Sequence, residues 1–174
     1  MNLDVPPEQL APDVEFRWAW RQGDAALEAE AIDFWARNGL LRPGTDPVER
    51  ARELVVVARK DGRTVGLITG QVGRLDQVRA RLVFFRGSID PDHRRSHIGF
   101  VLLLVAQRRF EEWAAAHPEE RIAGQGSFME SRELAELARI ACSSEPFRLG
   151  VVGFLPDGRQ IRVHWFRDVH LDLE

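Results

Sequence analysis

Residues 89–104 read Ile89-Asp90-Pro91-Asp92-His93-Arg94-Arg95-Ser96-His97-Ile98-Gly99-Phe100-Val101-Leu102-Leu103-Leu104. A β-rich run ends at Ile89, a short basic loop follows Pro91, and a strongly apolar helical pattern begins directly afterwards. The first turn of a helix has unpaired N–H groups and the positive end of the helix dipole, so it attracts anions. Arg94 and Arg95 add fixed positive charge, and Gly99 lets a ligand approach the backbone closely. This order of elements therefore predicts a site for a phosphorylated ligand.

Length and composition describe an ordinary globular chain. Its 174 residues, 44% hydrophobic and 29% charged, predict about one domain with a real core. The net charge of −3 argues against a general nucleic-acid binder. The single cysteine excludes an internal disulfide, and no histidine and carboxylate pair has metal-ligand spacing, so we expect no metal. Without a signal-peptide pattern or an apolar run of about 20 residues, we expect a soluble, cytoplasmic protein with no membrane partner.

The rest of the chain predicts an alternation of helices and hairpins. The lead-in over residues 1–12 should be irregular and the acidic tail over residues 168–174 exposed. The sequence predicts Asp24 as a helix N-cap and Gly39 as a helix stop. Two Asp-Gly turns, at residues 61–62 and 157–158, predict hairpins and hence a largely antiparallel sheet. The expected elements are strands over 14–20, 54–58, 64–72, 79–89, 121–129, 147–155 and 160–166, and helices over 25–38, 47–52, 97–116 and from Ser131 onward.

The basic loop resembles motif A of the GCN5-related N-acetyltransferase (GNAT) superfamily. That motif is a hydrophobic residue, then x-Pro-x-x-Arg-x-x-Gly-x-Gly/Ala and a hydrophobic helix. Ile89, Pro91, Arg94 and Gly99 stand at matching positions, whereas His97 replaces the first glycine. The element order over residues 14–166 also resembles that of the superfamily. The resemblance implies one α+β domain over residues 1–174, with a twisted, mostly antiparallel sheet of about seven strands and about four flanking helices.

The same resemblance implies acetyl-CoA as a co-substrate. Backbone N–H groups of the loop would hold its pyrophosphate, namely those of Arg94, Arg95, Ser96, His97, Ile98 and Gly99. The end of the preceding strand, near Ile89, would pair with the pantetheine amides as an added strand does. The side chain at position 97 either crowds the pyrophosphate or donates a hydrogen bond to it, and the sequence leaves both open. The simpler alternative is a strand-to-helix turn with solvated arginines.

Amine acetylation needs a base for the attacking ammonium and benefits from an acid for the leaving thiolate. Glu130, after the strand over residues 121–129, and His164, on the last hairpin, are candidate bases. Glu130 is equally a first-turn acid of the next helix. Many members of the superfamily use a tyrosine as the acid, but this chain contains none. Cys142, Ser143 or Ser144 could take its place, although a buried structural cysteine or a helix-end Ser-Ser pair is the simpler interpretation.

We therefore expect an acetyl-CoA-dependent N-acetyltransferase in which a small-molecule or peptide amine attacks the thioester directly. The alternative is a catalytically inactive GNAT-fold binding module, because His97 replaces a motif glycine and tyrosine is missing. A third hypothesis is an enzyme that uses another acyl-CoA. Trp18, Trp20 and Trp35 fall where the superfamily builds its acceptor pocket, although buried aromatic residues are more often core. Edge strands also favour a homodimer.

Overall fold

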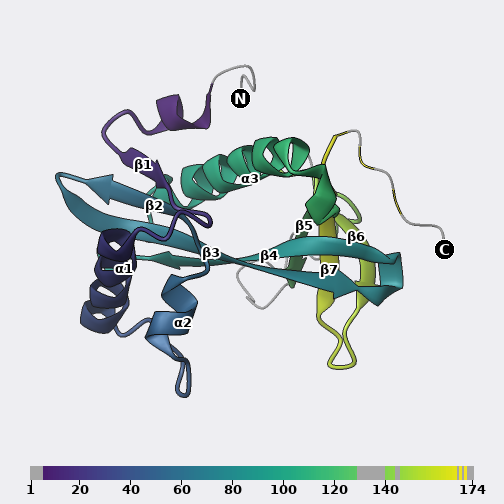
Figure 1. Ribbon diagram of the computed structural model, residues 1–174, viewed down its shortest axis with the longest axis horizontal. Helices are drawn as coiled ribbons and strands as arrows, with labels where there is room; N and C mark the ends of the chain where they lie inside the picture. The colour runs from purple at the N-terminus through teal and green to yellow at the C-terminus, as the bar shows by residue number, and fades with distance from the viewer. Residues whose placement is uncertain (1–5, 129–139, 144–145, 168, 170, 172–174) are drawn as a thin grey trace. The chain divides into compact units, whose positions relative to one another are not determined.

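The computed structural model describes residues 6–128, 140–143, 146–167, 169 and 171. Its contacts divide the chain into two compact units. The first unit comprises Met1–Gly70 and Arg86–Phe110, and the second comprises Gln71–Phe85 and Glu111–Glu174. Figure 1 shows the elements, which are β1 (Glu15–Trp18), α1 (Ala25–Asn38), α2 (Pro47–Ala51), β2 (Leu54–Lys60), β3 (Arg63–Leu75), β4 (Ala80–Ile89), α3 (Ile98–Ala116), β5 (Ile122–Phe128), β6 (Gly150–Phe154) and β7 (Gln160–Trp165).

The seven strands form one sheet in the order β1-β2-β3-β4-β5-β7-β6. β4 and β5 are parallel, whereas β1–β2, β2–β3, β5–β7 and β6–β7 are antiparallel. The predicted mixed fold with a mostly antiparallel sheet is therefore confirmed. The described part of the chain holds three α-helices, and the helix expected from Ser131 lies outside the described residues. That the whole chain forms one domain stays a prediction.

Local signals in the first unit produce the predicted helices. The Asp24 carboxylate accepts hydrogen bonds from the N–H groups of Ala26, at 3.0 Å, and Leu27, at 3.1 Å, which satisfies two orphan donors at the start of α1. Gly39 ends the helix with φ 60°, a left-handed conformation that glycine adopts without steric cost. The Asp46 side chain caps α2 in the same way.

Two expectations for the N-terminal segment are wrong in detail. Residues 1–12 were expected to be irregular, but Pro7–Leu10 form a short 3-10 helix with proline at its start. The strand expected over residues 14–20 is only Glu15–Trp18. The apolar alternation continues beyond it because Trp20 packs against Phe110 of α3, with ring centroids 5.0 Å apart, and not because the strand continues.

In the first unit, α1 and α2 lie on one face of the strands, and the part of α3 up to Phe110 lies on the other (Figure 1). Trp35 of α1 donates a hydrogen bond from Nε1 to Ser88 Oγ of β4, at 3.1 Å. The next residue, Ile89, points to the other face, where its side chain lies against Gly99 of α3. Trp35 lies within the core formed by Ala19, Leu27, Ala31, Phe34, Trp35, Ala51, Leu54, Val57 and Leu67.

In the second unit, two glycines let β5 be approached very closely. A Cβ at Gly124 would lie 2.3 Å from the carbonyl oxygen of His164 on β7. A Cβ at Gly126 would lie 2.4 Å from the ring of Phe84, which stacks on Phe128 with centroids 5.0 Å apart. These two glycines therefore mark places where neighbouring groups approach the backbone of β5 closely. This unit's core comprises Leu75, Ala80, Leu82, Ala123, Ile161 and Val163.

Candidate functional site

The basic loop lies between the end of β4 and the start of α3, as the sequence predicts. Asp90 follows β4, and its N–H donates to the carbonyl oxygen of Val65 on β3 at 2.9 Å, which ties the start of the loop to the sheet. The Asp90 carboxylate then accepts the N–H of Asp92 at 2.9 Å and caps a 3-10 turn over Pro91–His93. These two hydrogen bonds therefore fix the backbone conformation at the point where the loop leaves β4.

Within the loop, Ser96 makes the central contacts. Its N–H and its hydroxyl both donate to the carbonyl oxygen of His93, at 3.0 and 2.6 Å. Its Oγ also accepts the N–H of Ile98 at a long 3.3 Å, and the N–H of Arg94 reaches the Pro91 carbonyl at 3.4 Å. Because the last two bonds are long, these donors are held weakly and are available to a better acceptor.

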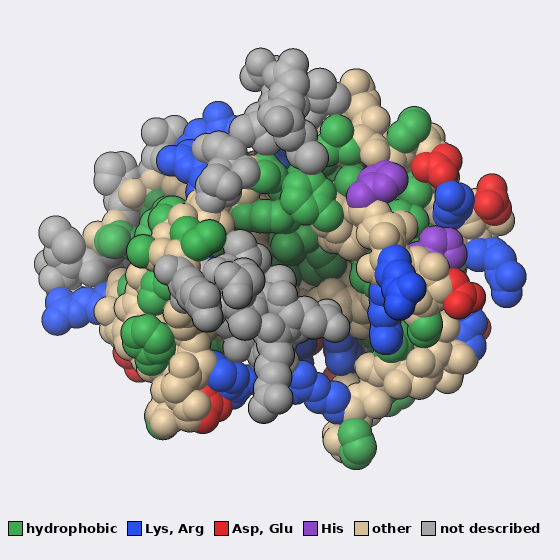
Figure 2. Space-filling view, turned by 180° about the vertical axis from the view of Figure 1, so that it is seen from behind, with side chains coloured by type: hydrophobic (Ala, Val, Ile, Leu, Met, Phe, Trp, Pro, Cys, Tyr) green, Lys and Arg blue, Asp and Glu red, His purple; other side chains and the backbone are tan. Residues whose placement is uncertain are grey.

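The cationic side chains of the loop face solvent. Arg94, Arg95, Ser96 and His97 are all exposed. Over the ranges that the structure describes, neither Arg94 nor Arg95 forms a side-chain hydrogen bond or ion pair. On one part of the surface, Figure 2 shows histidine and lysine or arginine side chains with aspartate or glutamate side chains among them. The guanidinium groups of Arg94 and Arg95, without a partner among the described residues, can bind a phosphate or a carboxylate.

His97, which replaces the motif glycine, lies near the carboxylate of Asp13. A hydrogen bond from Lys60, at 2.5 Å, is the main reason that the pKa of Asp13 is lowered, and the charge of His97 also lowers it. Sequence reasoning missed this group because Asp13 and Lys60 are 47 residues apart. The exposed imidazole is compatible both with crowding a bound pyrophosphate and with donating a hydrogen bond to it.

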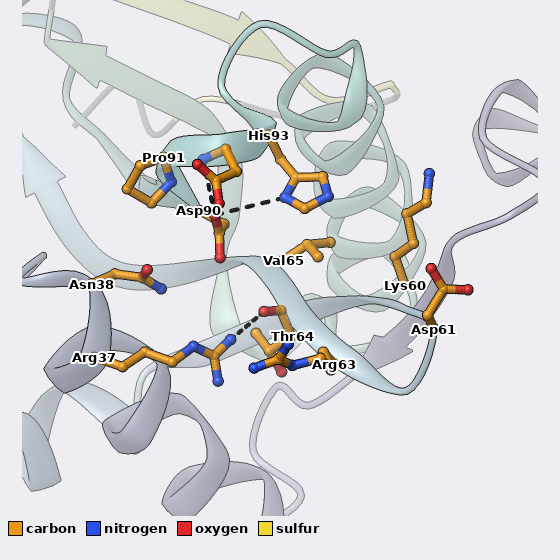
Figure 3. A pocket seen from close by; sticks show the side chains of 11 residues that line it. Arg37, Asn38, Lys60, Asp61, Arg63, Thr64, Val65, Asp90, Pro91 and His93 are labelled. Carbon is orange, nitrogen blue, oxygen red and sulfur yellow. Dashed lines mark hydrogen bonds and ion pairs between the residues drawn. The ribbon is translucent and has the colours of Figure 1, made fainter.

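A cavity of about 520 Å³ borders the first part of the loop in the first unit (Figure 3). Asp90 and His93 form one wall, where the His93 Nδ1 lies 3.7 Å from the Asp90 carboxylate. On the other side, Arg37 donates to the carbonyl oxygen of Thr64 at 2.5 Å. Lysine, arginine and aspartate side chains all line this cavity, so its charge favours neither anions nor cations.

Sequence reasoning missed a second cationic residue, Arg50, which lies on the side of β4 where Trp35 meets Ser88. Arg50 of α2 stacks over the indole of Trp35, with its guanidinium carbon 5.1 Å from the ring centroid. Burial lowers the pKa of Arg50, and the charges of Arg86 and Arg42 lower it further, whereas Glu53 raises it. The one sequence feature that could have pointed to this region is Arg86, a charged residue within the otherwise apolar part of β4.

The catalytic candidates are placed less favourably. Glu130 lies outside the described residues. His164 lies on β7 opposite Gln125 and is only 8% exposed, so its side chain is largely closed to solvent. Cys142 is exposed, so its interpretation as a buried structural cysteine is wrong. Among the tryptophans, Trp35 is fully buried and Trp20 nearly so, which makes both of them core.

The described residues contain no group of three or more histidine, cysteine, aspartate or glutamate side chains arranged to hold a metal ion. No helix in the same residues is long and apolar enough to cross a membrane.

The architecture defines the class of fold. An open, mostly antiparallel sheet has one parallel pair, β4–β5, and a basic loop joins the first strand of that pair to a buried helix. The chain has the fold of the GNAT superfamily, as the resemblance at residues 89–99 implies.

Solved structures with this fold match nearly the whole chain. An acetyltransferase named yncA from Salmonella typhimurium, described as putative and with its cofactor acetyl-CoA, has a TM-score of 0.60 at 16% identity, covering 93% of this chain and 98% of the other. The ribosomal-protein-S18-alanine N-acetyltransferase from Escherichia coli has a TM-score of 0.57 at 14% identity, covering 92% and 99%. A GNAT-family acetyltransferase from Streptococcus pneumoniae has a TM-score of 0.51 at 13% identity, covering 88% and 99%. By sequence, the chain matches no protein-family model and no curated protein.

Proposed function

We propose that this protein is an acetyl-CoA-dependent N-acetyltransferase. The observation that carries the proposal is the exposed basic loop between β4 and α3, in which the guanidinium groups of Arg94 and Arg95 have no partner among the described residues. A diphosphate placed at the start of α3 would meet these charges, the helix dipole and several backbone N–H groups. The fold, shared with solved acetyltransferases, supports the same conclusion.

The residues present fit a pyrophosphate. We assign the cradle to the backbone of residues 94–99, with Arg94 and Arg95 supplying charge. The long bond between Ile98 and Ser96 leaves a donor that can turn to a phosphate oxygen. We assign the pantetheine amides to the backbone near Ile89, the last residue of β4. Internal packing does not require a glycine at position 99, because a Cβ there would make only ordinary contact with Ile89, at 3.4 Å. The glycine is therefore compatible with a role in letting the ligand approach the backbone closely.

The cofactor supplies an activated acetyl thioester. In the proposed reaction, the acceptor nitrogen forms a bond to the acetyl carbonyl carbon as the carbon–sulfur bond breaks. The ammonium form of the acceptor must first lose a proton, and the thiolate of CoA takes one up as it leaves. No covalent enzyme intermediate is involved. Glu130 and His164 stay the proposed bases, and the acceptor is an amine of a small molecule or a peptide.

Isothermal titration with acetyl-CoA tests the cradle. We expect wild-type protein to bind and Arg94→Gln to bind about tenfold more weakly, because a charge-assisted contact to phosphate is lost. Arg52→Gln is the matched control, since Arg52 is an exposed arginine at the end of α2, away from the loop. No heat at millimolar acetyl-CoA, or an equal affinity for all three proteins, would contradict the proposal.

Thiol release in the presence of amines then separates the hypotheses. Release that depends on both an amine and Arg94 supports the transferase. Binding of acetyl-CoA without release for any amine favours the inactive binding module. Faster release from a longer acyl-CoA than from acetyl-CoA assigns the enzyme to another acyl donor.

A further inference from the structure

The cavity beside the basic loop has the size of a small-molecule site. Its volume of about 520 Å³ lies within the roughly 300–1,000 Å³ typical of such sites, and all of its lining belongs to the first unit. The end of α1, the β2–β3 hairpin and the start of the basic loop line it (Figure 3). The side chains of this lining make their hydrogen bonds and ion pairs only with described residues.

Arg37 and Arg63 supply positive charge on one side of the cavity (Figure 3). Arg37 donates to the carbonyl oxygen of Thr64 at 2.5 Å, and its guanidinium carbon lies 5.3 Å from the ring centroid of Phe34. Arg63, the first residue of β3, is exposed and makes no side-chain hydrogen bond or ion pair with the described residues. Neither guanidinium is paired with a carboxylate there, so both can bind one that a ligand brings.

Asp90 and His93 supply acceptors on the other side (Figure 3). One carboxylate oxygen of Asp90 accepts the N–H of Asp92 at 2.9 Å and lies 3.7 Å from Nδ1 of His93. This Nδ1 is buried and makes no hydrogen bond with the described residues, and the nearby carboxylate favours a proton on it. The second oxygen of Asp90 and Nε2 of His93 are then left as acceptors for an N–H donor.

Charges of opposite sign thus line one cavity without pairing across it. Among the described residues, no arginine lies within ion-pair distance of Asp90, and the exposed acids Asp61 and Asp92 pair with none either. The remaining cation, Lys60, is held by Asp13 at 2.5 Å. A simple anion would be attracted by the arginines but repelled by the carboxylates, and the reverse holds for a simple cation. A molecule with both an ammonium and a carboxylate satisfies both sides at once.

We infer that this cavity binds a small zwitterion, a free amino acid or a short peptide, and that its occupant regulates the basic loop. The carboxylate of the ligand lies on the arginine side and its ammonium on the side of Asp90 and His93. This site is separate from the proposed place of acetyl transfer. Pantetheine is assigned to the backbone near Ile89 and runs back along β4, whereas the lining of the cavity begins only after Ile89.

His93 belongs to both the cavity and the basic loop. Its side chain lines the cavity, while its carbonyl oxygen accepts the N–H of Ser96 at 3.0 Å and the Ser96 hydroxyl at 2.6 Å. A ligand that fixes the imidazole also fixes this carbonyl, and with it the middle of the loop. The zwitterion should therefore tighten acetyl-CoA binding, a consequence that rests on the proposed function. By linkage, acetyl-CoA should tighten binding of the zwitterion by the same factor.

Isothermal titration without acetyl-CoA tests the site itself. The probes are 5-aminopentanoate, which carries both charges, and pentanoate and pentylamine, which carry one each, all at the same ionic strength. We expect wild type to bind the zwitterion about tenfold more tightly than either single-charge partner, because one further charge-assisted contact is made. Equal affinities for the three probes would overturn the inference. Glycine and triglycine then separate a free amino acid from a short peptide, because the charges of the peptide lie further apart.

Arg63→Gln and Asp90→Asn each remove one charge from one side of the cavity. Arg63→Gln should lose most of the preference for 5-aminopentanoate over pentylamine, and Asp90→Asn most of the preference over pentanoate. Asparagine at position 90 keeps the oxygen that caps the 3-10 turn. Arg52→Gln, which changes an exposed arginine outside the cavity, should behave as wild type. Carboxylate binding at residues 94–99 is common to all four proteins, so it does not produce these differences. Wild-type preferences in folded Arg63→Gln and Asp90→Asn, with folding checked by circular dichroism, would overturn the inference.

Titration of acetyl-CoA with 5-aminopentanoate present tests the regulation. At a probe concentration that saturates wild type, we expect the affinity of wild type and Arg52→Gln for acetyl-CoA to rise about fivefold, and that of Arg63→Gln to change little. Binding of the probe without a change in acetyl-CoA affinity would overturn the regulatory role. If acetyl-CoA does not bind at all, the proposed function fails, whereas the direct titration still decides whether the cavity binds a zwitterion.

Discussion

Ser96 binds the carbonyl oxygen of His93 twice, through its backbone N–H at 3.0 Å and its hydroxyl at 2.6 Å. The same oxygen atom therefore fixes both the backbone and the side chain at the middle of the basic loop. Through Oγ, Ser96 also reaches the N–H of Ile98 at the start of α3. One small side chain thus connects the end of the 3-10 turn to the first residue of the helix.

Replacing Ser96 by alanine should loosen the loop. We expect the free energy of unfolding to fall by about 1 kcal/mol, as for the loss of a capping hydroxyl, and the affinity for acetyl-CoA to fall as well. Urea denaturation measures the first effect and isothermal titration the second. Ser96→Thr keeps the hydroxyl and should restore both. An alanine variant that binds acetyl-CoA as tightly as wild type would show that the loop does not need this preorganisation.

His97 offers a direct comparison with the motif. Its side chain is exposed, so His97→Gly should change the Tm little. We expect acetyl-CoA to bind the glycine variant about two- to fivefold more weakly, the range for loss of one exposed charge-assisted contact. Titration calorimetry at constant pH and salt measures the change. Tighter binding by the glycine variant would mean that the imidazole crowds the pyrophosphate.

Gly124 is the glycine that β5 needs most. A Cβ there would lie 2.3 Å from the His164 carbonyl oxygen, and backbone atoms on a paired strand cannot move aside. We expect Gly124→Ala to lower the free energy of unfolding by at least about 2 kcal/mol. Gly73→Ala on β3 is the control, because its Cβ would meet the Phe84 ring at an ordinary 3.7 Å. Denaturation curves in which both variants match wild type would contradict the close approach.

Features that depend on neighbouring residues could be predicted from the sequence. Asp24 caps α1 because its carboxylate reaches N–H groups two and three residues away. Asp61 and Gly62 both have positive φ, as a tight Asp-Gly hairpin turn requires. The loop from Ile89 to Gly99 belongs to the same class, since strand end, turn and helix start follow one another directly.

Features that depend on distant residues could not be predicted. Nothing near Arg50 in the sequence indicates that its guanidinium stacks on Trp35, because the contact requires α1 and α2 to pack together. Nothing around Gly126 in the sequence indicates that the ring of Phe84 lies against it, because this contact requires β4 to pair with β5. His164 alternates with apolar residues in the sequence, but only the pairing of β5 with β7 places it opposite Gln125.

Glu30 of α1 should make the stability of the first unit sensitive to acid. Its carboxylate pairs with Arg59 of β2, with Nε at 2.8 Å, and also accepts a hydrogen bond from the Thr64 hydroxyl. The hydrogen bond from Arg59 is the main cause that lowers the pKa of Glu30, and Thr64 adds to it against the opposing effect of burial. A carboxyl whose pKa is lower in the folded state stabilises the fold above its unfolded pKa.

Glu30→Gln should therefore lower the free energy of unfolding at pH 7 by about 1 kcal/mol, since the pair is partly exposed and screened. As the pH falls below about 4, wild type loses the same interaction by protonation, and the two stability curves should converge. Urea denaturation at a series of pH values measures the difference. Asp33→Asn, which removes an exposed acid from the same helix, should follow wild type throughout. A Glu30→Gln difference that is constant from pH 7 to pH 3 would show that the charge of Glu30 is not what stabilises the contact between α1 and β2.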